Sequence, residues 1–268
     1  EIYRCDWSSD VCSSDLGYLV KLNSQGQRLW GTYIYSGVDD LQLYNDDIYL
    51  RGGAALPNTT IATSNTFQQA EARTSLQKFN SQNGTQVWGT YFGAPNNQSF
   101  HLLFSMKVNE SGIFLNGTAY NMLNSNYYTT PGSFKEVMTG STDLFLTKFN
   151  HNGNRIWGTF FGGDGDEGSN DMNTMDVFGT EIIITGNQYG GENLATPYAY
   201  KTEKSTAINN LFFTKFDTNG NRLWTSYYGD ANRFNGYETE FINVKIKDNN
   251  TFYLFGNTNA LTGFSTQG

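Results

Sequence analysis

Oxygen-donating side chains gather in one short stretch of the sequence, Gly162-Gly163-Asp164-Gly165-Asp166-Glu167-Gly168-Ser169-Asn170-Asp171. Its carboxylates belong to Asp164, Asp166, Glu167 and Asp171. Carboxylate oxygens are the ligands that calcium prefers, but the stretch fails the EF-hand pattern because Gly168 falls early and no Glu ends the loop. It also fails the calcium-binding β-helix repeat, because it occurs once. We interpret it as a solvated turn, with calcium as the alternative and no other cofactor expected.

Imidazole chemistry depends on two residues, His101 and His151. His151 occupies a turn position that holds Ser24, Ser81 or Thr218 in other copies of a repeat, and His101 has no Cys, Asp or Glu beside it, so both are interpreted as structural. No Ser-His-Asp grouping, pair of carboxylates on neighbouring strands, phosphate-binding loop or Cys-His cluster can be assembled from the sequence. We therefore predict a protein that is not an enzyme.

The residues between these groups follow a repeat marked by tryptophan. Four similar stretches, each with an aromatic residue three positions after the tryptophan, contain Trp30, Trp88, Trp157 and Trp224. Their spacings of 58, 69 and 67 residues are too long for one hairpin, so each copy is predicted to be a supersecondary unit. The tryptophans are expected to occupy equivalent, largely buried positions.

A column of lysines precedes the tryptophans, formed by Lys21, Lys78, Lys148 and Lys215. Each lysine is followed by an apolar residue, then by Asn or Asp, then by a turn containing Gly, which predicts a β-hairpin. We interpret the lysines as structural, with their stems on apolar surface and their ammonium groups at solvent or neighbouring carbonyls. A functional ring of positive charge is the alternative.

A second hairpin is predicted before the first in each unit, because a strand ending in glycine recurs at Gly52, Gly117, Gly186 and Gly256. This gives four strands per unit. Several strands are apolar on both faces, as sheets covered on both sides require. The predicted fold is an all-β β-propeller of four-stranded antiparallel blades, with about four blade-equivalents. The chain opens on the second hairpin of one unit and stops after the first hairpin of another, which predicts an arc of a larger propeller.

The third unit, from Asp143 through Trp157 to Gly163, resembles the signature of the SBBP-type β-propeller repeat family. The resemblance extends over residues 17–268. Thr130-Pro131-Gly132-Ser133-Phe134 is similar to a Thr-Pro-Gly-Ala-Phe stretch of that family, and residues 196–200 are similar more loosely. The resemblance implies a bacterial protein that is secreted or attached to the cell surface.

Residues 1–16 lie outside this pattern. The stretch from Cys5 to Leu16, CDWSSDVCSSDL, resembles a translated sequencing adapter, and it holds both cysteines of the chain. A Cys5–Cys12 disulfide loop is the alternative interpretation. We favour a non-native, adapter-derived segment at 1–16, which leaves residues 17–268 as the repeat domain and as a fragment of a longer protein.

Composition excludes some functions. The formal charge of −8 argues against nucleic acid as a partner, because phosphate backbones need clustered Lys and Arg. No apolar run long enough to span a bilayer occurs in the sequence. The remaining expectation is a non-enzymatic, extracellular or cell-surface scaffold that binds a protein or a glycan. The alternative is part of a propeller hydrolase or lyase whose site lies partly in missing blades.

Binding is predicted on the segments that connect the two hairpins of each unit, residues 53–74, 118–142 and 187–209. They exceed the usual length of connections, and they differ among the copies while the strands stay alike. Tyr127, Tyr128 and Tyr189 are the candidate binding residues, because aromatic faces suit sugars and peptides. The alternative is that Phe134 and Tyr200 anchor these segments over the blade edge.

Overall fold

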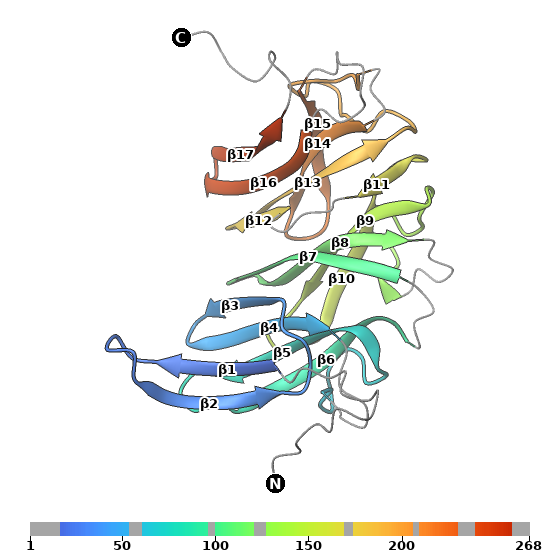
Figure 1. The fold of residues 1–268 in the computed structure, drawn as a ribbon. Coiled ribbons are helices and arrows are strands. Elements are labelled where there is room, and N and C mark those ends of the chain that lie inside the picture. Colours follow the sequence, from blue (N-terminus) through green and yellow to red (C-terminus); the bar gives the residue numbers. More distant parts are fainter. Residues whose placement is uncertain are drawn as a thin grey trace, which may run out of the picture. The chain divides into compact units, whose positions relative to one another are not determined.

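The computed structural model describes residues 17–53, 61–95, 100–120, 127–168, 174–205, 209–229 and 239–258. The regular elements of these ranges are β-strands (Figure 1). The chain divides into two compact units, Glu1–Asn96 and Asn97–Gly268, so the predicted repeat domain contains a boundary that the repeat pattern did not indicate. In the part of the chain that the structure describes, no helix has the length and apolar character needed to cross a bilayer.

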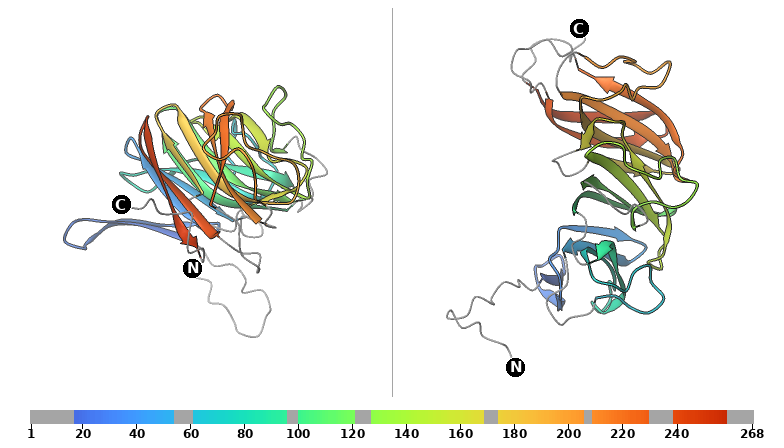
Figure 2. Two further views of the ribbon diagram at one scale, coloured as in Figure 1. Left: turned by 90° about the horizontal axis from the view of Figure 1, so that it is seen from above. Right: turned by 90° about the vertical axis from the view of Figure 1, so that its right-hand side faces the viewer.

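The first unit consists of a two-stranded and a four-stranded antiparallel sheet. Its strands are β1 (Gly17–Leu22), β2 (Arg28–Ile34), β3 (Asp40–Tyr44), β4 (Asp47–Gly53), β5 (Ala72–Asn80) and β6 (Gln86–Pro95). Strands β1 and β2 form a hairpin by themselves, and the other four follow one another in chain order, β3-β4-β5-β6. Figure 2 shows β1 and β2 as a long, twisted ribbon.

The second unit consists of a four-stranded, a five-stranded and a two-stranded antiparallel sheet. Its strands are β7 (Phe100–Asn109), β8 (Gly112–Tyr120), β9 (Thr142–Phe149), β10 (Arg155–Phe161), β11 (Asp166–Gly168), β12 (Met175–Phe178), β13 (Glu181–Tyr189), β14 (Asn209–Asp217), β15 (Arg222–Tyr228), β16 (Thr239–Asp248) and β17 (Thr251–Thr258). One sheet has the order β7-β8-β9-β10. In the next sheet β11 and β12 both pair with β13, which is followed by β14 and β15. Strands β16 and β17 form a two-stranded sheet.

These meanders confirm the predicted all-β fold of four-stranded antiparallel propeller blades. In each four-stranded sheet we call the first two strands the inner hairpin and the last two the outer hairpin. By the repeat, β1–β2 is an outer hairpin and β16–β17 an inner one. The arc of a larger propeller stays a prediction.

The lysine and tryptophan columns are in register in the outer hairpins. The lysine and the tryptophan are direct cross-strand partners in all four copies: Lys21 with Trp30, Lys78 with Trp88, Lys148 with Trp157 and Lys215 with Trp224. Each pair adjoins a shift in register, so the strands bend at the same place. The four tryptophans therefore occupy equivalent positions, as predicted. Trp88 is buried, but the other three are only half-buried.

The outer turns are closed by local hydrogen bonds. Asn23 Oδ1 accepts from the N–H groups of Gln25 and Gln27, at 3.0 and 2.8 Å, and Asp217 Oδ1 repeats this in the last copy. The turn glycines have positive φ angles, 78° at Gly26 and 88° at Gly220. The predicted turn chemistry is confirmed.

Lysine and tryptophan also join neighbouring sheets. Trp30 Nε1 and Lys21 Nζ both donate to the Ser81 carbonyl, at 3.1 and 3.0 Å. Trp157 Nε1 and Lys148 Nζ donate in the same way to the Thr218 carbonyl, both at 3.1 Å. In each joint the acceptor is the second turn residue of the following outer hairpin.

The other two lysines form ion pairs within their own sheets. Lys78 lies 2.7 Å from Asp47, and Lys215 pairs with Glu181. The predicted contact with neighbouring carbonyls is therefore found at Lys21 and Lys148. Lys78 and Lys215 have structural contacts of a different kind, with carboxylates of their own sheets.

Apolar residues fill the space between sheets. Leu144, Leu146 and Phe161 of the β7–β10 sheet pack with Ile182 and Phe212 of the following sheet, and all five are essentially inaccessible. Removing such side chains from water supplies the main stabilising free energy. This packing explains why several strands are apolar on both faces.

Candidate functional site

The connecting segments lie along the outer strands. The N–H groups of Thr63, Thr130 and Thr196 donate to carbonyls of Gly89, Gly158 and Thr225, each at 2.9 Å. Farther along, the carbonyls of Gln68, Lys135 and Lys201 accept from the N–H groups of Tyr91, Phe160 and Tyr227. These bonds cover an edge that would otherwise be open to pairing with another strand. In these portions the structure favours the alternative that the segments cover the strand edge, and it does not favour free recognition loops.

Phe134 anchors its segment between two sheets. Its ring stacks on the Phe161 ring, and its centroid lies 5.9 Å from the centroid of the Phe216 ring. The Arg222 guanidinium lies over the Phe134 ring, 4.9 Å from the centroid. Tyr200 occupies the equivalent position and contacts Tyr228, but it is 75% exposed.

Of the predicted binding tyrosines, Tyr128 is in the core. Its side chain is inaccessible, and its hydroxyl is 2.8 Å from His101 Nδ1. His101, 2% exposed, also packs against Phe145, so this histidine is structural, as the sequence indicated. Tyr127 is half-buried, and its carbonyl accepts from Arg155. The prediction that Tyr128 lies on a binding tip is therefore wrong. Its ring packs against Phe145 and Phe160 and anchors the connecting segment in the core.

Tyr189 has a different setting, because it borders a wide depression of about 590 Å³. The lining is formed by Thr139, Gly140, Ser141, Asp164, Gly165, Asp166, Tyr189 and Gly191. Three chain segments converge here, and glycine permits their close approach. A Cβ on Gly140 would overlap the Gly165 carbonyl, and one on Gly191 would overlap the Gly165 backbone.

Two carboxylates and one aromatic ring face this depression. Asp166 and Tyr189 are direct cross-strand partners, so their side chains lie on one face. Asp166 Oδ1 accepts from the N–H of Ser141 at 2.9 Å, and Asp164 Oδ1 accepts from the N–H of Glu192 at 2.6 Å. Tyr189 is 38% exposed. The arrangement offers carboxylate acceptors beside an accessible aromatic face.

Glu167 points instead into the protein, where a second carboxyl group meets it. Glu167 and Asp143 are both inaccessible, and their oxygens flank Gly162 so closely that a Cβ there would overlap both. Glu167 Oε2 accepts from the Gly163 N–H at 2.9 Å. Burial, with a smaller contribution from the Asp143 charge, raises the pKa of Glu167 to about 7. Burial also raises the pKa of Asp143.

A lysine neutralises this carboxyl pair. Lys135 Nζ lies 2.8 Å from Asp143 Oδ2 and donates to the carbonyls of Gly162 and Gly163, at 2.8 and 3.2 Å. The Asp143–Glu167 pair was not predicted, because the sequence showed no two carboxylates on neighbouring strands. A weak signal existed, because Asp143 opens an otherwise apolar strand.

The predicted calcium ligands separate into two environments. Asp164 and Asp166 line the depression and bind backbone amides, Glu167 is buried, and Asp171 lies outside the described residues. Among the described residues, no group of three or more His, Cys, Asp or Glu side chains is placed to hold a metal ion. Calcium stays a minority prediction.

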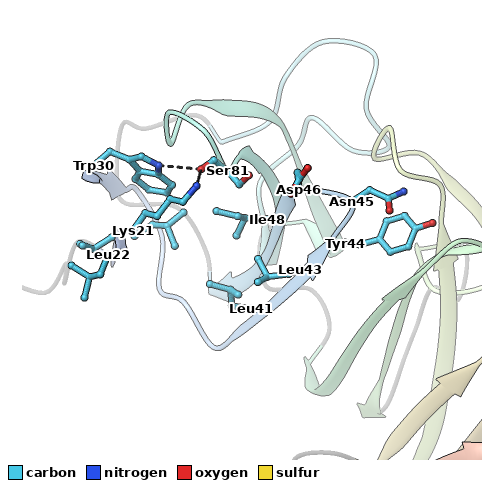
Figure 3. A pocket seen from close by; sticks show the side chains of 12 residues that line it. Lys21, Leu22, Trp30, Leu41, Leu43, Tyr44, Asn45, Asp46, Ile48 and Ser81 are labelled. Carbon is cyan, nitrogen blue, oxygen red and sulfur yellow. Dashed lines mark hydrogen bonds between the residues drawn. The ribbon is translucent and has the colours of Figure 1, made fainter. Parts of the chain in front are cut away.

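The first unit has an apolar hollow of about 510 Å³ between its hairpin and its four-stranded sheet. Figure 3 shows Lys21 and Trp30 bonded to Ser81 on one side, with Leu41, Leu43 and Ile48 facing them. The side chains of Leu41 and Leu43 are 42% and 69% exposed. Both leucines therefore present apolar surface at the hollow.

No protein-family model matches the chain, and no curated protein matches it. Among solved structures, BamB from Moraxella catarrhalis is similar, with a TM-score of 0.35 and 12% sequence identity. The match covers 78% of this chain and 58% of BamB, so the chain spans less than two thirds of that structure. At this identity and TM-score, nothing about function passes from BamB to this chain. The resemblance to SBBP repeats and the adapter origin of residues 1–16 stay predictions.

Proposed function

We propose that the chain is a non-enzymatic propeller scaffold of a secreted or cell-surface protein, and that it binds a glycan in the depression beside Tyr189. The observation that carries this proposal is the pairing of Asp166 with Tyr189 across two strands, which sets a carboxylate next to an exposed ring. Sugars present hydroxyl donors around an apolar ring face, so carboxylates and an aromatic surface complement them.

The geometry favours a hydroxyl-rich ligand over an anionic one. Asp164 and Asp166 bring negative charge to the lining, and the rest is glycine backbone, hydroxyl groups and Tyr189. A phosphate or sulfate group would meet repulsion from both carboxylates. The hydrogen bonds from backbone N–H groups hold the carboxylate oxygens of Asp164 and Asp166 in place, so these side chains lose little conformational entropy on binding.

The buried Asp143–Glu167 pair supplies no support for the enzyme alternative. Both carboxyl groups are inaccessible, and the Lys135 ammonium already pairs with Asp143. General acid–base catalysis needs a group within reach of the substrate. We therefore interpret this pair as structural.

The test is a glycan array probed with the full chain, followed by titration of any captured glycan against variants. Tyr189→Ser should weaken binding by about tenfold, equivalent to about 1.4 kcal/mol, through loss of the ring face. Asp164→Asn should also weaken binding, while its amide oxygen still accepts from the Glu192 N–H. Tyr198→Ser is the control, because Tyr198 is fully exposed elsewhere.

Two results would contradict the proposal. One is failure of the parent chain to capture any glycan on the array. The other is a Tyr189→Ser variant that binds as tightly as the parent and the Tyr198→Ser control.

A further inference from the structure

Asp143 lies between an amine and a second carboxyl group. Its Oδ2 atom is 2.8 Å from Lys135 Nζ. Its Oδ1 atom and Glu167 Oε2 both lie against Gly162, since a Cβ on this glycine would overlap both. The side chains of Asp143 and Glu167 are inaccessible, and that of Lys135 is 15% exposed. One Asp143 oxygen therefore faces the amine and the other faces Glu167, in a place shielded from solvent.

Three further contacts hold the Lys135 amine in this place. Nζ donates to the Gly162 carbonyl at 2.8 Å, to the Gly163 carbonyl at 3.2 Å and to Thr139 Oγ1 at 2.8 Å. The amine therefore cannot swing away from Asp143 without losing several hydrogen bonds. An amine and a carboxyl group that a fold holds together react as if each were present at very high concentration, because the entropy of bringing them together has already been lost on folding.

Glu167 is suited to carry a proton beside this pair. Its Oε2 atom accepts from the Gly163 N–H at 2.9 Å, whereas its buried Oε1 atom has no hydrogen-bond partner among the described residues. A buried carboxylate oxygen without a donor is costly, and a protonated carboxyl group avoids this cost. Burial also raises the pKa of Glu167 and that of Asp143. A proton can therefore reside between the two carboxyl groups.

We propose that Lys135 and Asp143 condense to an isopeptide bond in the folded chain, and that Glu167 moves the proton that this condensation requires. The new bond joins Lys135 Nζ to Asp143 Cγ. The reaction links two side chains of one chain and acts on no other substrate. It is therefore independent of the proposed glycan binding.

The condensation needs no other reactant. The Lys135 ammonium first passes one proton to Asp143 Oδ2, which leaves a neutral amine beside a carboxylic acid. The Nζ lone pair then forms the bond to Cγ while Glu167 gives its proton to Oδ1. When the Cγ–Oδ2 bond breaks, a proton from the nitrogen joins the departing hydroxyl as water, and Glu167 takes back the proton of Oδ1. An ammonium and a carboxylate have then become one amide and one water molecule.

A second lysine–carboxylate pair in the chain provides a comparison. Lys78 Nζ lies 2.7 Å from Asp47 Oδ2, and the Lys78 side chain is also 15% exposed. The Asp47 side chain, however, is 28% exposed, so solvent reaches its carboxylate and favours the charged form. We expect no condensation between Lys78 and Asp47, although their separation is almost the same as that of Lys135 and Asp143.

The next copy of the repeat has other partners at the corresponding positions. By the repeat, Lys201 corresponds to Lys135 and Asn210 to Asp143. Asn210 Oδ1 accepts from the N–H and the hydroxyl of Ser205, both at 2.7 Å, and Lys201 Nζ donates to a backbone carbonyl. No bond is therefore expected between Lys201 and Asn210.

The proposed bond would close a ring of the chain from Lys135 to Asp143. This ring contains Thr139, Gly140 and Ser141, which form one side of the depression beside Tyr189. Closure would restrict the backbone of these residues, because both ends of the segment would be fixed by covalent bonds. The bond would therefore make one wall of the depression rigid.

The first experiment follows the mass of the full chain, under reducing conditions, by mass spectrometry during incubation near neutral pH. The fraction of folded chains that is lighter by one water molecule should rise with time. The same chain held in urea gives the background of water loss, because the three groups meet only in the fold. Freshly purified chains of full mass still carry the titratable pair, and unfolding measurements on that pair use those chains.

The second experiment locates the bond. Trypsin cuts after lysine, but it should fail to cut after a condensed Lys135. A protease specific for glutamate opens the chain at Glu136, and the fragments that end at Glu136 and begin at Val137 should then stay joined. A cyclic imide formed by Asp143 alone also loses water, but it leaves Lys135 cleavable and the fragments separate. Trypsin should continue to cut after Lys78, which is the internal control.

Variants test the role of each group. Glu167→Gln keeps an acceptor for the Gly163 N–H and should slow the loss of water by about 100-fold, because it removes the acid and base. Lys135→Arg keeps a cation beside Asp143 and should abolish the reaction, because a guanidinium stays protonated. Glu203→Gln, at an exposed position, is the matched control and should react at the parent rate.

Each outcome decides the proposal. Water loss that rises in the folded parent, together with joined fragments, would support it. A parent chain that keeps its full mass would overturn it, and so would water loss that leaves Lys135 fully cleavable. Reaction of Glu167→Gln at the parent rate would overturn the role of Glu167. The parent chain and its urea control decide whether the bond forms even where a variant fails to fold.

Discussion

Replacing Glu167 by Gln tests whether the buried carboxyl pair makes stability depend on pH. The carboxyl groups of Glu167 and Asp143 meet beside Gly162, with Lys135 on Asp143 and the Gly163 N–H on Glu167. Tyr227 does not titrate in the range tested, because burial above all, with a smaller contribution from the Glu167 charge, raises the pKa of its hydroxyl to about 12. Glutamine retains an acceptor for the Gly163 N–H and removes the titration.

The magnitude follows from the pKa difference between the folded and unfolded states. Burial raises the pKa of Glu167 from 4.5 to about 7, so between these values the folded protein binds the proton more tightly. The associated stability is fully present below pH 4.5 and is lost as pH rises through 7. At 1.36 kcal/mol per pKa unit, the loss from this group is about 3 kcal/mol. The pKa of Asp143 is raised too, so part of the slope stays in the variant.

The measurement is urea unfolding, followed by tryptophan fluorescence, at intervals from pH 4.5 to 8.5. The parent should lose about 3 kcal/mol more than Glu167→Gln across this range, and the variant should be the more stable protein at pH 8.5. Glu203→Gln is the control, because Glu203 is exposed. Equal pH slopes in the parent and Glu167→Gln would refute the reasoning, as would a variant that is less stable at every pH.

Three further predictions concern the repeat and the first residues. Trp157→Ala should lower the free energy of unfolding by about 3 kcal/mol through lost packing, whereas Ile156→Ala, at a 49% exposed position, should change it little in the same urea experiment. Gly220→Ala should cost more than Gly132→Ala, because only the first adds a tight contact with the Trp157 ring, at 3.1 Å, to the strain of a positive φ. Equal costs would refute the contact between the turn and the tryptophan. Deleting residues 1–16 should leave the thermal midpoint unchanged, and a loss of several degrees would contradict an adapter origin.

The hairpins and their register could be predicted from the sequence because their signals are local. Asn and Asp bond the backbone of their own turn, and the turn glycine supplies the positive φ that closes it. Once the turn is set, the lysine and tryptophan on its two sides must oppose each other. The same copies, aligned by their tryptophans, indicated four strands per unit.

The candidate site was only partly predictable. Asp164, Asp166 and Tyr189 were selected for separate reasons, as calcium ligands and as a binding aromatic, and the structure brings them to one depression. Tyr128 was misassigned because its segment is irregular. In such a segment no periodicity distinguishes an exposed tip from an anchor.

The sequence by itself determined the strands, the turns and the repeat, because each depends on residues close together in the chain. Tertiary structure alone decided which distant groups meet: Glu167 with Asp143, Tyr128 with His101, and the three glycine-rich segments around the depression. These meetings follow from sheets packing face to face, which buries some side chains and leaves their neighbours exposed. Burial then sets the chemistry, because it raises the pKa of Glu167. Asp166, one residue earlier, lies at the surface of the depression.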